Sequence, residues 1–282
     1  MWYEKYLSIY NCPIKSVPSE IIEEISNSYK QKSNDEPVVS VVAIAHNEGE
    51  RILACLWSLL DNECKYPIEI YVVNDDSEDD LSKTLFSMGI TMIFEERRSP
   101  GYARQAGLNF SRGKYSICID SDTLYPPHYI ETMVDALQDE RYSCAYGLWS
   151  FLPDKDLNRF KIRIYELFRD LYLYIQHLKR PELNVRGMVF AYKTELARKY
   201  GFRKDIIRGE DGSLALNLKN DGKIRFVRSH RARPITDNSI LKARGSLRDA
   251  ALFRFRKGLN GFFGLFTSKK HYKDHDDNLI TY

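Results

Sequence analysis

Two acidic residues, Asp120 and Asp122, stand one residue apart in the segment KYSICIDSDTLYP at residues 114–126. The residues before them alternate or run apolar as in a buried strand, so the acids mark the place where that strand ends. An Asp-Ser-Asp turn can satisfy its own backbone amides, and this purely structural explanation is open for the pair taken alone. The rest of the chain has to decide whether the two charges form a site.

Polar and acidic residues also follow two other predicted strands. AHNE follows the apolar run that opens at residue 38, and NDDSEDD follows the run that opens at residue 68. In an open parallel sheet, ligands bind beyond the carboxyl ends of the strands, where the strand order reverses. Acids at neighbouring strand ends repel one another unless a cation or a ligand donor group lies among them. The three strand ends together therefore predict a functional site.

The elements that must position these acids alternate along the chain. Strands are predicted in VVSVVAIAHN, IEIYVVNDDSEDD, TMIFEE and KYSICID, and helices in EGERILACLWSLLDN, DLSKTLFSMG and YARQAGLNFSRG. This β-α-β-α-β order requires a parallel sheet with helices on its faces. Ahead of it, residues 18–32 predict a short amphipathic helix with Ser19 as its cap, packed on the main domain.

Five segments now resemble, in their order, the inverting family-two glycosyltransferases of the GT-A fold. They are VSVVAIAHNE, IYVVNDDSED, GYARQAGLNFSRGKYSICIDSDT, RGMVFAYKTEL and GEDGSLALNLKNDGKIRFV, between Val38 and Val227. The resemblance implies an α/β fold with a Rossmann-like, mostly parallel central sheet and helices on both faces. We expect an N-terminal extension (1–36), a glycosyltransferase domain (37–236) with a nucleotide-binding half (37–125) and an acceptor half (126–236), and a basic, partly helical tail (237–282).

The resemblance implies a nucleotide-sugar donor and residues that bind it. The nucleotide-binding residues are expected to be Ala45, Asn47, Glu48, Asp75, Arg104 and Asp120. Asp75 matches the carboxylate that recognises the base, although the usual Asp-Asp pair is Asn-Asp here. A carboxylate accepts from the ring N–H of uracil or thymine, so UDP or dTDP is favoured and GDP stays open. Arg104 matches a helix-start arginine near the nucleotide, with a solvated helix arginine as the alternative.

A divalent metal ion is also implied. Asp120 and Asp122 match the family's DxD motif, with Ser121 pointing away, and hard carboxylate ligands suit Mg²⁺ or Mn²⁺. His230 lies where some relatives supply a further metal ligand, and an ordinary surface histidine is the alternative.

The acids Glu210 and Asp211 carry the expected catalysis. Acids in a first helical turn suit the helix dipole, which is the structural alternative. The resemblance instead makes Asp211 the general base that takes the proton of an acceptor hydroxyl, and Glu210 an acceptor-binding or orienting residue. The hydroxyl then attacks the anomeric carbon opposite the nucleotide, which inverts its configuration. The basic segment GFRKDIIR before this pair departs from the family's acidic pattern, and the absence of a Gln-x-x-Arg-Trp motif favours addition of single sugars.

Composition argues against several other classes of protein. A net charge of +3 over 282 residues argues against a surface built to grip nucleic acid. Five cysteines without paired spacing predict reduced thiols in a cytoplasmic protein, and we expect neither a cleaved signal nor a membrane span.

Two apolar segments leave their roles open. The aromatic stretch LNRFKIRIYELFRDLYLYIQHLK suits either core packing or a platform for a saccharide or lipid-linked saccharide acceptor. The basic, Phe-rich tail suits either a domain-closing helix or peripheral contact with the inner face of a membrane.

Two other functions are alternatives to glycosyl transfer. A sugar nucleotidyltransferase would show a glycine-rich phosphate loop after the first strand, where this chain has AIAHNEGER. A catalytically silent sugar-nucleotide binding protein would have no use for both the DSD and the GED segments.

Overall fold

The computed structural model describes residues 1–75, 81–242 and 278–280. Its strands are β1 (Val39–Ala45), β2 (Ile68–Asp75), β3 (Met92–Glu95), β4 (Tyr115–Asp120), β5 (Thr123–Leu124), β6 (Tyr142–Gly147), β7 (Ser150–Phe151), β8 (Phe190–Lys193), β9 (Lys223–Val227) and β10 (Ile235–Thr236). Its α-helices are α1 (Ser19–Lys32), α2 (Ile52–Leu60), α3 (Leu81–Ser87), α4 (Pro100–Phe110), α5 (Tyr129–Asp135), α6 (Arg159–His177), α7 (Thr194–Tyr200), α8 (Glu210–Leu218) and α9 (Ser239–Lys242). Short 3₁₀ helices are η1 (Glu4–Ser8), η2 (Ile14–Ser16), η3 (Pro181–Asn184), η4 (Gly187–Val189) and η5 (His230–Ala232).

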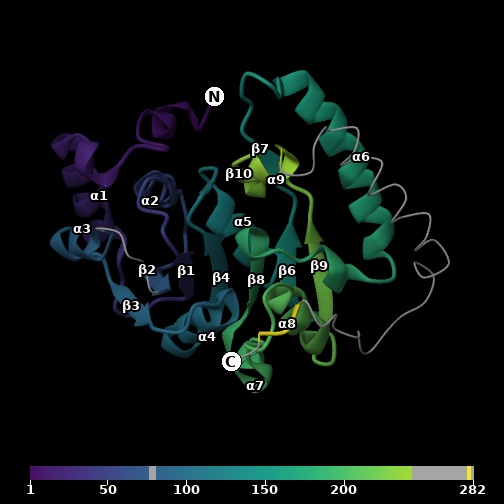
Figure 1. Ribbon diagram of the computed structural model, residues 1–282. Coiled ribbons are helices and arrows are strands. Elements are labelled where there is room, and N and C mark those ends of the chain that lie inside the picture. Colours follow the sequence, from purple (N-terminus) through teal and green to yellow (C-terminus); the bar gives the residue numbers. More distant parts are fainter. Residues whose placement is uncertain (76–80, 243–277, 281–282) are drawn as a thin grey trace.

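A seven-stranded sheet forms the centre of the molecule, in the order β3-β2-β1-β4-β8-β6-β9 (Figure 1). The strands β3, β2, β1 and β4 run parallel, and only β8 runs antiparallel to its neighbours. The chain passes from β1 to β2 and β3 on one side and then returns to β4 on the other. The order therefore reverses between β1 and β4, which confirms the predicted mixed α/β architecture and places the crevice at the ends of these two strands.

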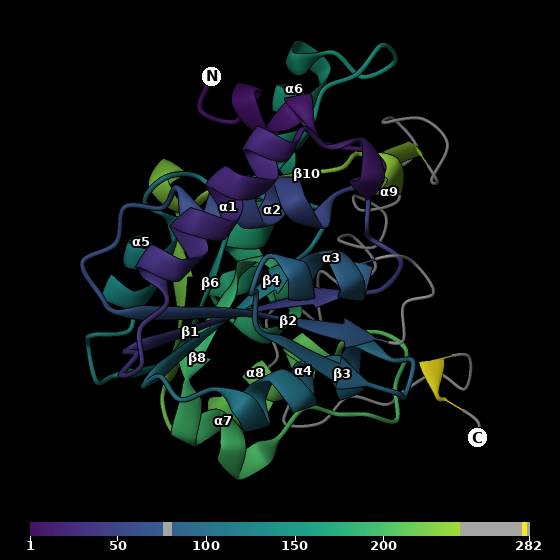
Figure 2. The same cartoon turned by 90° about the vertical axis from the view of Figure 1, so that its left-hand side faces the viewer.

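Helices cover both faces of this sheet, as Figure 2 shows, with α1 and α2 on one side and α4 and α7 on the other. Alternate residues of each strand supply the two cores. In β1, Val41 and Ala43 pack toward α2, whereas Val42 packs toward Ala103 of α4. The near-continuous apolar pattern of β1 is therefore explained by burial on both faces.

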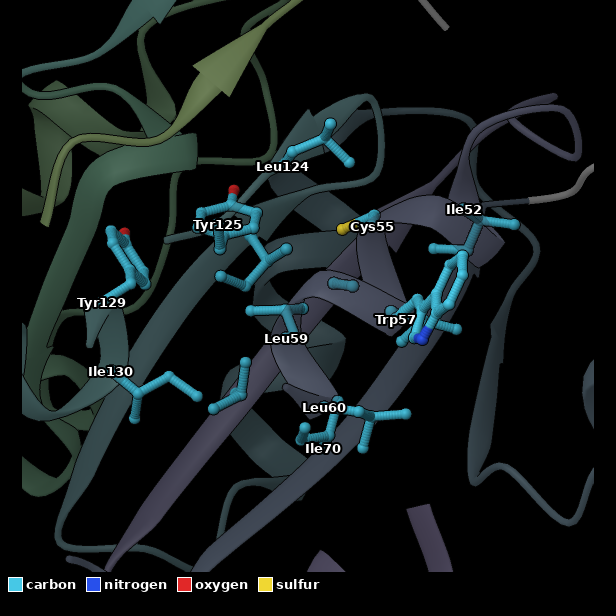
Figure 3. Packing of buried hydrophobic residues seen from close by; sticks show 14 of the residues in the cluster. Ile52, Cys55, Trp57, Leu59, Leu60, Ile70, Leu124, Tyr125, Tyr129 and Ile130 are labelled. Atoms are coloured by element: carbon cyan, nitrogen blue, oxygen red, sulfur yellow. The ribbon is translucent and has the colours of Figure 1, made fainter. Parts of the chain in front are cut away.

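The helix α2 is buried on all sides, because other elements enclose the face that it turns away from the sheet. Figure 3 shows its residues Leu59 and Leu60 with Ile70 of β2 and Ile130 of α5, which belong to one core cluster. The N-terminal segment closes the outer side, where the ring of Tyr6 meets Trp57 edge-on at 5.4 Å. The Trp57 indole also donates to Glu24 of α1 at 2.9 Å. The N-terminal extension is thus part of the core.

The start of α1 differs from the expectation. Ser19 is the first helical residue and Pro18 occupies the cap position, with no side-chain capping bond. A proline just before the helix fixes the backbone angle φ at −56°, which suits helix entry without a side-chain cap.

A second, three-stranded sheet of order β5-β10-β7 lies beside the first. It joins the turn after β4 to the segment that follows β9, because Thr236 of β10 pairs with Thr123 of β5. Most of the tail predicted at 237–282 lies outside the described residues. No helix in the described part of the chain is long and apolar enough to cross a bilayer.

Candidate active site

A cavity of about 290 Å³ opens at the carboxyl ends of β1 and β4. It is lined by Ile44, Ala45, His46, Glu48, Pro100, Arg104, Asp120, Ser121, Asp122, Glu210 and Asp211. These residues come from four separate parts of the sequence, which the reversal of strand order and the helices α4 and α8 bring to one place. Three polar segments singled out in the sequence, AHNE, DSD and GED, thus share one cavity.

Asp120 and Asp122 flank the turn between β4 and β5. The Asp122 carboxylate accepts from Thr123 Oγ1 at 2.9 Å and from Thr236 Oγ1 at 3.4 Å. The Tyr10 hydroxyl donates to the Asp122 backbone carbonyl at 2.6 Å. The turn is therefore held by side chains from the N-terminal segment and from β10, over and above its own backbone.

The carboxylates at this turn lie in a strongly negative environment. Burial, then the charge of Asp120, raises the pKa of Asp122 to about 6, with Thr123 and Arg51 acting in the opposite direction. Burial, then the charge of Asp122, raises the pKa of Glu48 to about 7, although Arg51 lies 3.6 Å from its carboxylate. A divalent cation at this point would relieve both costs.

Arg104 joins this acidic turn to the acidic start of α8. Its side chain is 2% exposed, donates to the Ile119 carbonyl at 2.8 Å and pairs with the Asp120 carboxylate. Its Nε atom lies 3.6 Å from Oδ1 of Asp211. The alternative of a solvated helix arginine is therefore wrong.

Arg104 reaches this position because residue 187 is a glycine. A Cβ atom at Gly187 would lie 2.0 Å from Arg104 Nη2 and 3.0 Å from Asp211 Oδ2. Both distances are shorter than van der Waals contact, so any larger residue would displace the guanidinium or the carboxylate.

Glu210 and Asp211 form the first turn of α8, directly after Gly209, whose φ of +101° is a conformation that favours glycine. Burial raises the pKa of Asp211 well above its ordinary value, the neighbouring Glu210 adds to the effect, and Arg104 opposes it. Asp211 Oδ1 is buried and has no hydrogen-bond partner among the described residues. Asp211 lines the cavity, and a buried carboxylate with a raised pKa is suited to accept a proton.

The loop before α8 is held by residues far along the chain. Asn278 accepts through its backbone carbonyl from Ile207 N at 2.9 Å. Its side chain accepts from Arg208 N at 3.1 Å and donates to Arg208 O at 3.0 Å. These three bonds fix the backbone one residue before Gly209.

The structure does not bring every predicted residue to the cavity. Asn47 is exposed in the loop after β1, with a φ of +53°, and does not line the cavity. Asp75 ends β2 opposite Glu95, and its side chain lies outside what the structure describes. His230 is exposed on η5, which packs against α5, and does not line the cavity either.

Three residues near the site were missed in the sequence. Asp237 contributes negative charge to the surroundings of both Asp122 and Glu48, and its carboxylate also accepts from Ser239 N at 2.6 Å. Tyr10 and Gly187 were missed as well. An aspartate in the segment PITDN was the only sequence signal for Asp237, and only the folded chain shows the contacts of the other two.

A match to a protein-family model shows which family this chain belongs to. The pattern described as glycosyl transferase family 2 matches residues 40–201, more than half of the chain. The protein belongs to this family. Among curated proteins, it is 24% identical over 254 residues to an uncharacterized glycosyltransferase of Methanocaldococcus jannaschii, and the aligned region covers 85% of this chain and 81% of that protein. It is 29% identical over 197 residues to the glycosyltransferase GlyA of Streptococcus pneumoniae. The aligned region covers 62% of this chain and only 27% of GlyA.

Solved structures show the same GT-A fold. A mannosyltransferase of Pyrobaculum calidifontis, in complex with GDP-Man and Mn²⁺, aligns with a TM-score of 0.54 at 18% identity, over 92% of this chain and 76% of that one. TarS residues 1–349 of S. aureus, in complex with UDP, align with a TM-score of 0.51 at 16% identity, over 71% of this chain and 60% of that one. The expectation of a family-two glycosyltransferase with a GT-A fold is confirmed.

Gly187→Ala should disrupt the site through Arg104. The added methyl group collides with the guanidinium, so we expect destabilisation of about 1–3 kcal/mol and a loss of transferase activity. A double-mutant cycle tests whether the methyl group acts through Arg104. Chemical unfolding and transferase activity are measured for each variant. If the methyl group acts through Arg104, the double variant Gly187→Ala/Arg104→Ala should be no worse than Arg104→Ala alone. Additive losses would show that Gly187 acts elsewhere.

The raised pKa of Asp122 predicts a pH dependence of stability without metal. Between the ordinary value of 3.8 and about 6, the folded protein binds more protons at this carboxyl than the unfolded chain does. The free energy of unfolding therefore falls as pH rises through this window. In EDTA, Asp122→Asn should be more stable than the parent at pH 7, by on the order of 1 kcal/mol, and this advantage should shrink toward pH 4. An advantage that does not change with pH in urea unfolding would refute the assignment.

Proposed function

We propose that the protein is a metal-dependent, inverting, non-processive glycosyltransferase that moves one sugar from a nucleotide sugar to a hydroxyl acceptor. The acceptor class would be a saccharide or lipid-linked saccharide in the assembly of cell-surface polysaccharide or glycolipid. One observation carries the proposal: the DSD turn and the GED turn open into one cavity, with buried Arg104 between Asp120 and Asp211. An inverting transfer needs a leaving group and a base on opposite sides of one reacting carbon, and two acidic turns in one cavity support this proposal.

A nucleoside diphosphate is the proposed donor carrier, with UDP or dTDP favoured over GDP. The position of Asp75 at the end of β2, beside β1, supports contact with a base. Ala45 and Glu48 line the cavity on the same side. Arg104 is braced by two protein carboxylates, so its role toward the nucleotide would be to hold Asp120 in place.

The acidic turn fits Mn²⁺ or Mg²⁺. Asp120 and Asp122 supply hard oxygen donors, and their environment raises the pKa of Asp122 as expected for an uncompensated carboxylate. The described residues form no cage of three or more such side chains, which suits an ion that also takes oxygens from a diphosphate and from water. When bound, the ion would supply charge stabilisation to the departing diphosphate.

Asp211 is the proposed general base. Its side chain lines the cavity, and its raised pKa makes the carboxylate a stronger base than an exposed aspartate. The acceptor hydroxyl gives its proton to this carboxylate as its own oxygen bonds to the anomeric carbon. The bond from that carbon to the diphosphate breaks on the opposite face, and inversion follows. Glu210, buried beside the base, would bind or orient the acceptor.

The two other functions find less support. Among the described residues that line the cavity none is a glycine, whereas a nucleotidyltransferase needs a glycine-rich loop around its phosphates. A silent binding protein would gain nothing from a buried carboxylate with a raised pKa, because burying that group costs stability.

Metal and donor should stabilise the protein together. In thermal unfolding, UDP with Mn²⁺ should raise the melting temperature much more than UDP with EDTA, because an ion held by Asp120 and Asp122 would also attract the diphosphate. Asp122→Asn should remove this difference. An equal effect of UDP in EDTA, or an unchanged variant, would end the metal assignment.

Asp211→Asn should separate chemistry from donor binding. Loss of a general base lowers the rate by about 10²- to 10⁴-fold, while the affinity for UDP with Mn²⁺ should stay the same. Arg104→Ala serves as the contrast, since it should weaken both. Wild-type turnover in Asp211→Asn would contradict the role of base, and a product with the donor's anomeric configuration, seen in its NMR coupling, would contradict the mechanism.

A further inference from the structure

The helix α6 exposes a continuous apolar face to solvent. Its exposed fractions range from 43% for Ile164 to 71% for Phe160. The exposed large apolar residues of this face are Phe160, Ile164, Leu167, Phe168, Leu171, Tyr174, Ile175 and Leu178. Their spacing of three and four residues places them on one side of the helix, along about 28 Å. Core packing, the favoured expectation for this aromatic stretch, is therefore wrong for this face.

The opposite side of α6 holds the helix on the protein. Ile162, Tyr165 and Leu173 are buried against β7 and η4. Figure 1 shows α6 along the outer flank of the molecule, beyond β9 and away from α1 to α3. A helix that is packed along one side and exposes a long apolar face on the other offers a docking surface for a binding partner.

Charge indicates which partner fits. Lys161, Arg163 and Lys179 are exposed beside the apolar face, and none forms an ion pair with a described residue. The acids of the helix turn inward instead. Glu166 is 8% exposed and accepts from the Phe151 backbone N–H at 3.1 Å.

Asp170, the second acid of α6, is also held inward. It pairs with Arg169 at 2.7 Å and with Arg233 at 2.9 Å. The exposed face of α6 is therefore apolar and cationic, with both acids of the helix neutralised behind it.

We propose that this face docks on an anionic membrane surface, with α6 lying in the plane of the interface. Apolar side chains enter the boundary between headgroups and acyl chains, and the cations at the rim meet anionic headgroups. A second copy of the chain fits less well, because a two-fold contact would bring the same cationic rim against itself. The segment 243–277 also fits less well, since its sequence has eight Lys or Arg against four Asp.

The position of α6 gives the docking a direction. Its inner side packs against Met188 and Val189 of η4, whose first residue Gly187 touches Arg104 and Asp211. A membrane on the outer side would thus lie next to the half of the molecule that holds the proposed base. This step alone rests on the proposed function, and it suits an acceptor carried by a lipid.

Vesicle co-sedimentation tests the proposal. The full chain should bind vesicles of phosphatidylcholine with phosphatidylglycerol more strongly than vesicles of phosphatidylcholine alone, and high salt should weaken the binding. The variant Phe160→Gln/Leu167→Gln/Phe168→Gln/Leu171→Gln should lower the partition coefficient by at least about 100-fold. The matched control Phe86→Gln/Phe94→Gln removes two exposed phenylalanines of α3 and β3 and should bind as the parent does.

Further variants test the contribution of charge and the insertion of the apolar face separately. Lys161→Gln/Arg163→Gln/Lys179→Gln should lose the preference for anionic vesicles but keep its fold. Phe168→Trp should show a blue shift of its fluorescence on addition of anionic vesicles. Donor binding by the α6 variants should stay at the parent's level, which separates this proposal from the proposed function.

Three outcomes would overturn the proposal. The first is vesicle binding that the α6 substitutions do not change. The second is a lower melting temperature of the four-residue variant, which would show that the face is covered within the chain. The third is a parent dimer that the variant turns into a monomer, measured by light scattering, which would assign the face to a second copy.

Discussion

A buried guanidinium between two carboxylates is the interaction on which the candidate site depends. Arg104 lies almost wholly out of water, where an unpaired charge would cost several kcal/mol. It is tolerated because Asp120 and Asp211 compensate it from the ends of β4 and α8. The same contact joins two stretches that are far apart in the sequence, and all three residues line the cavity. The contact requires that residue 187 has no side chain, because a Cβ atom there would collide with Arg104.

Charge differs in sign between the cavity and the exposed face of α6. At the cavity, Glu48, Asp122 and Asp237 crowd negative charge around one turn, which favours a cation and disfavours a bare anion. At α6, the acids are drawn inward by Arg169 and Arg233, which leaves the outer rim positive. A net charge of +3 conceals this separation.

The elements of the central sheet were predictable because their patterns are local. Apolar runs of strand length, followed by acids, located β1, β2 and β4, and the acids of GED were expected at the start of a helix that the structure confirms. The site residues that depend on distant packing were not predictable. His230 was expected from the family resemblance, whereas the further negative charge near Asp122 comes from Asp237, which follows β10 and is brought there by the pairing of β10 with β5. Tyr10 reaches the same turn over 112 residues, and no local pattern announces such a contact. For α6, periodicity revealed an apolar face but could not tell whether protein or solvent covers it.

The three hydrogen bonds between Asn278 and the backbone of Ile207 and Arg208 have a consequence for synthesis of the chain. Seventy residues separate Arg208 from its partner (278 − 208), so the loop before α8 leaves the ribosome long before the residue that fixes it. At about 5–20 residues per second, the delay is roughly 4–14 s. During this interval the strands β1 and β4, the helix α4 and the DSD turn can fold, while the loop before α8 still lacks these hydrogen bonds. The emerging chain can therefore form the DSD side of the cavity before the backbone ahead of α8 is fixed.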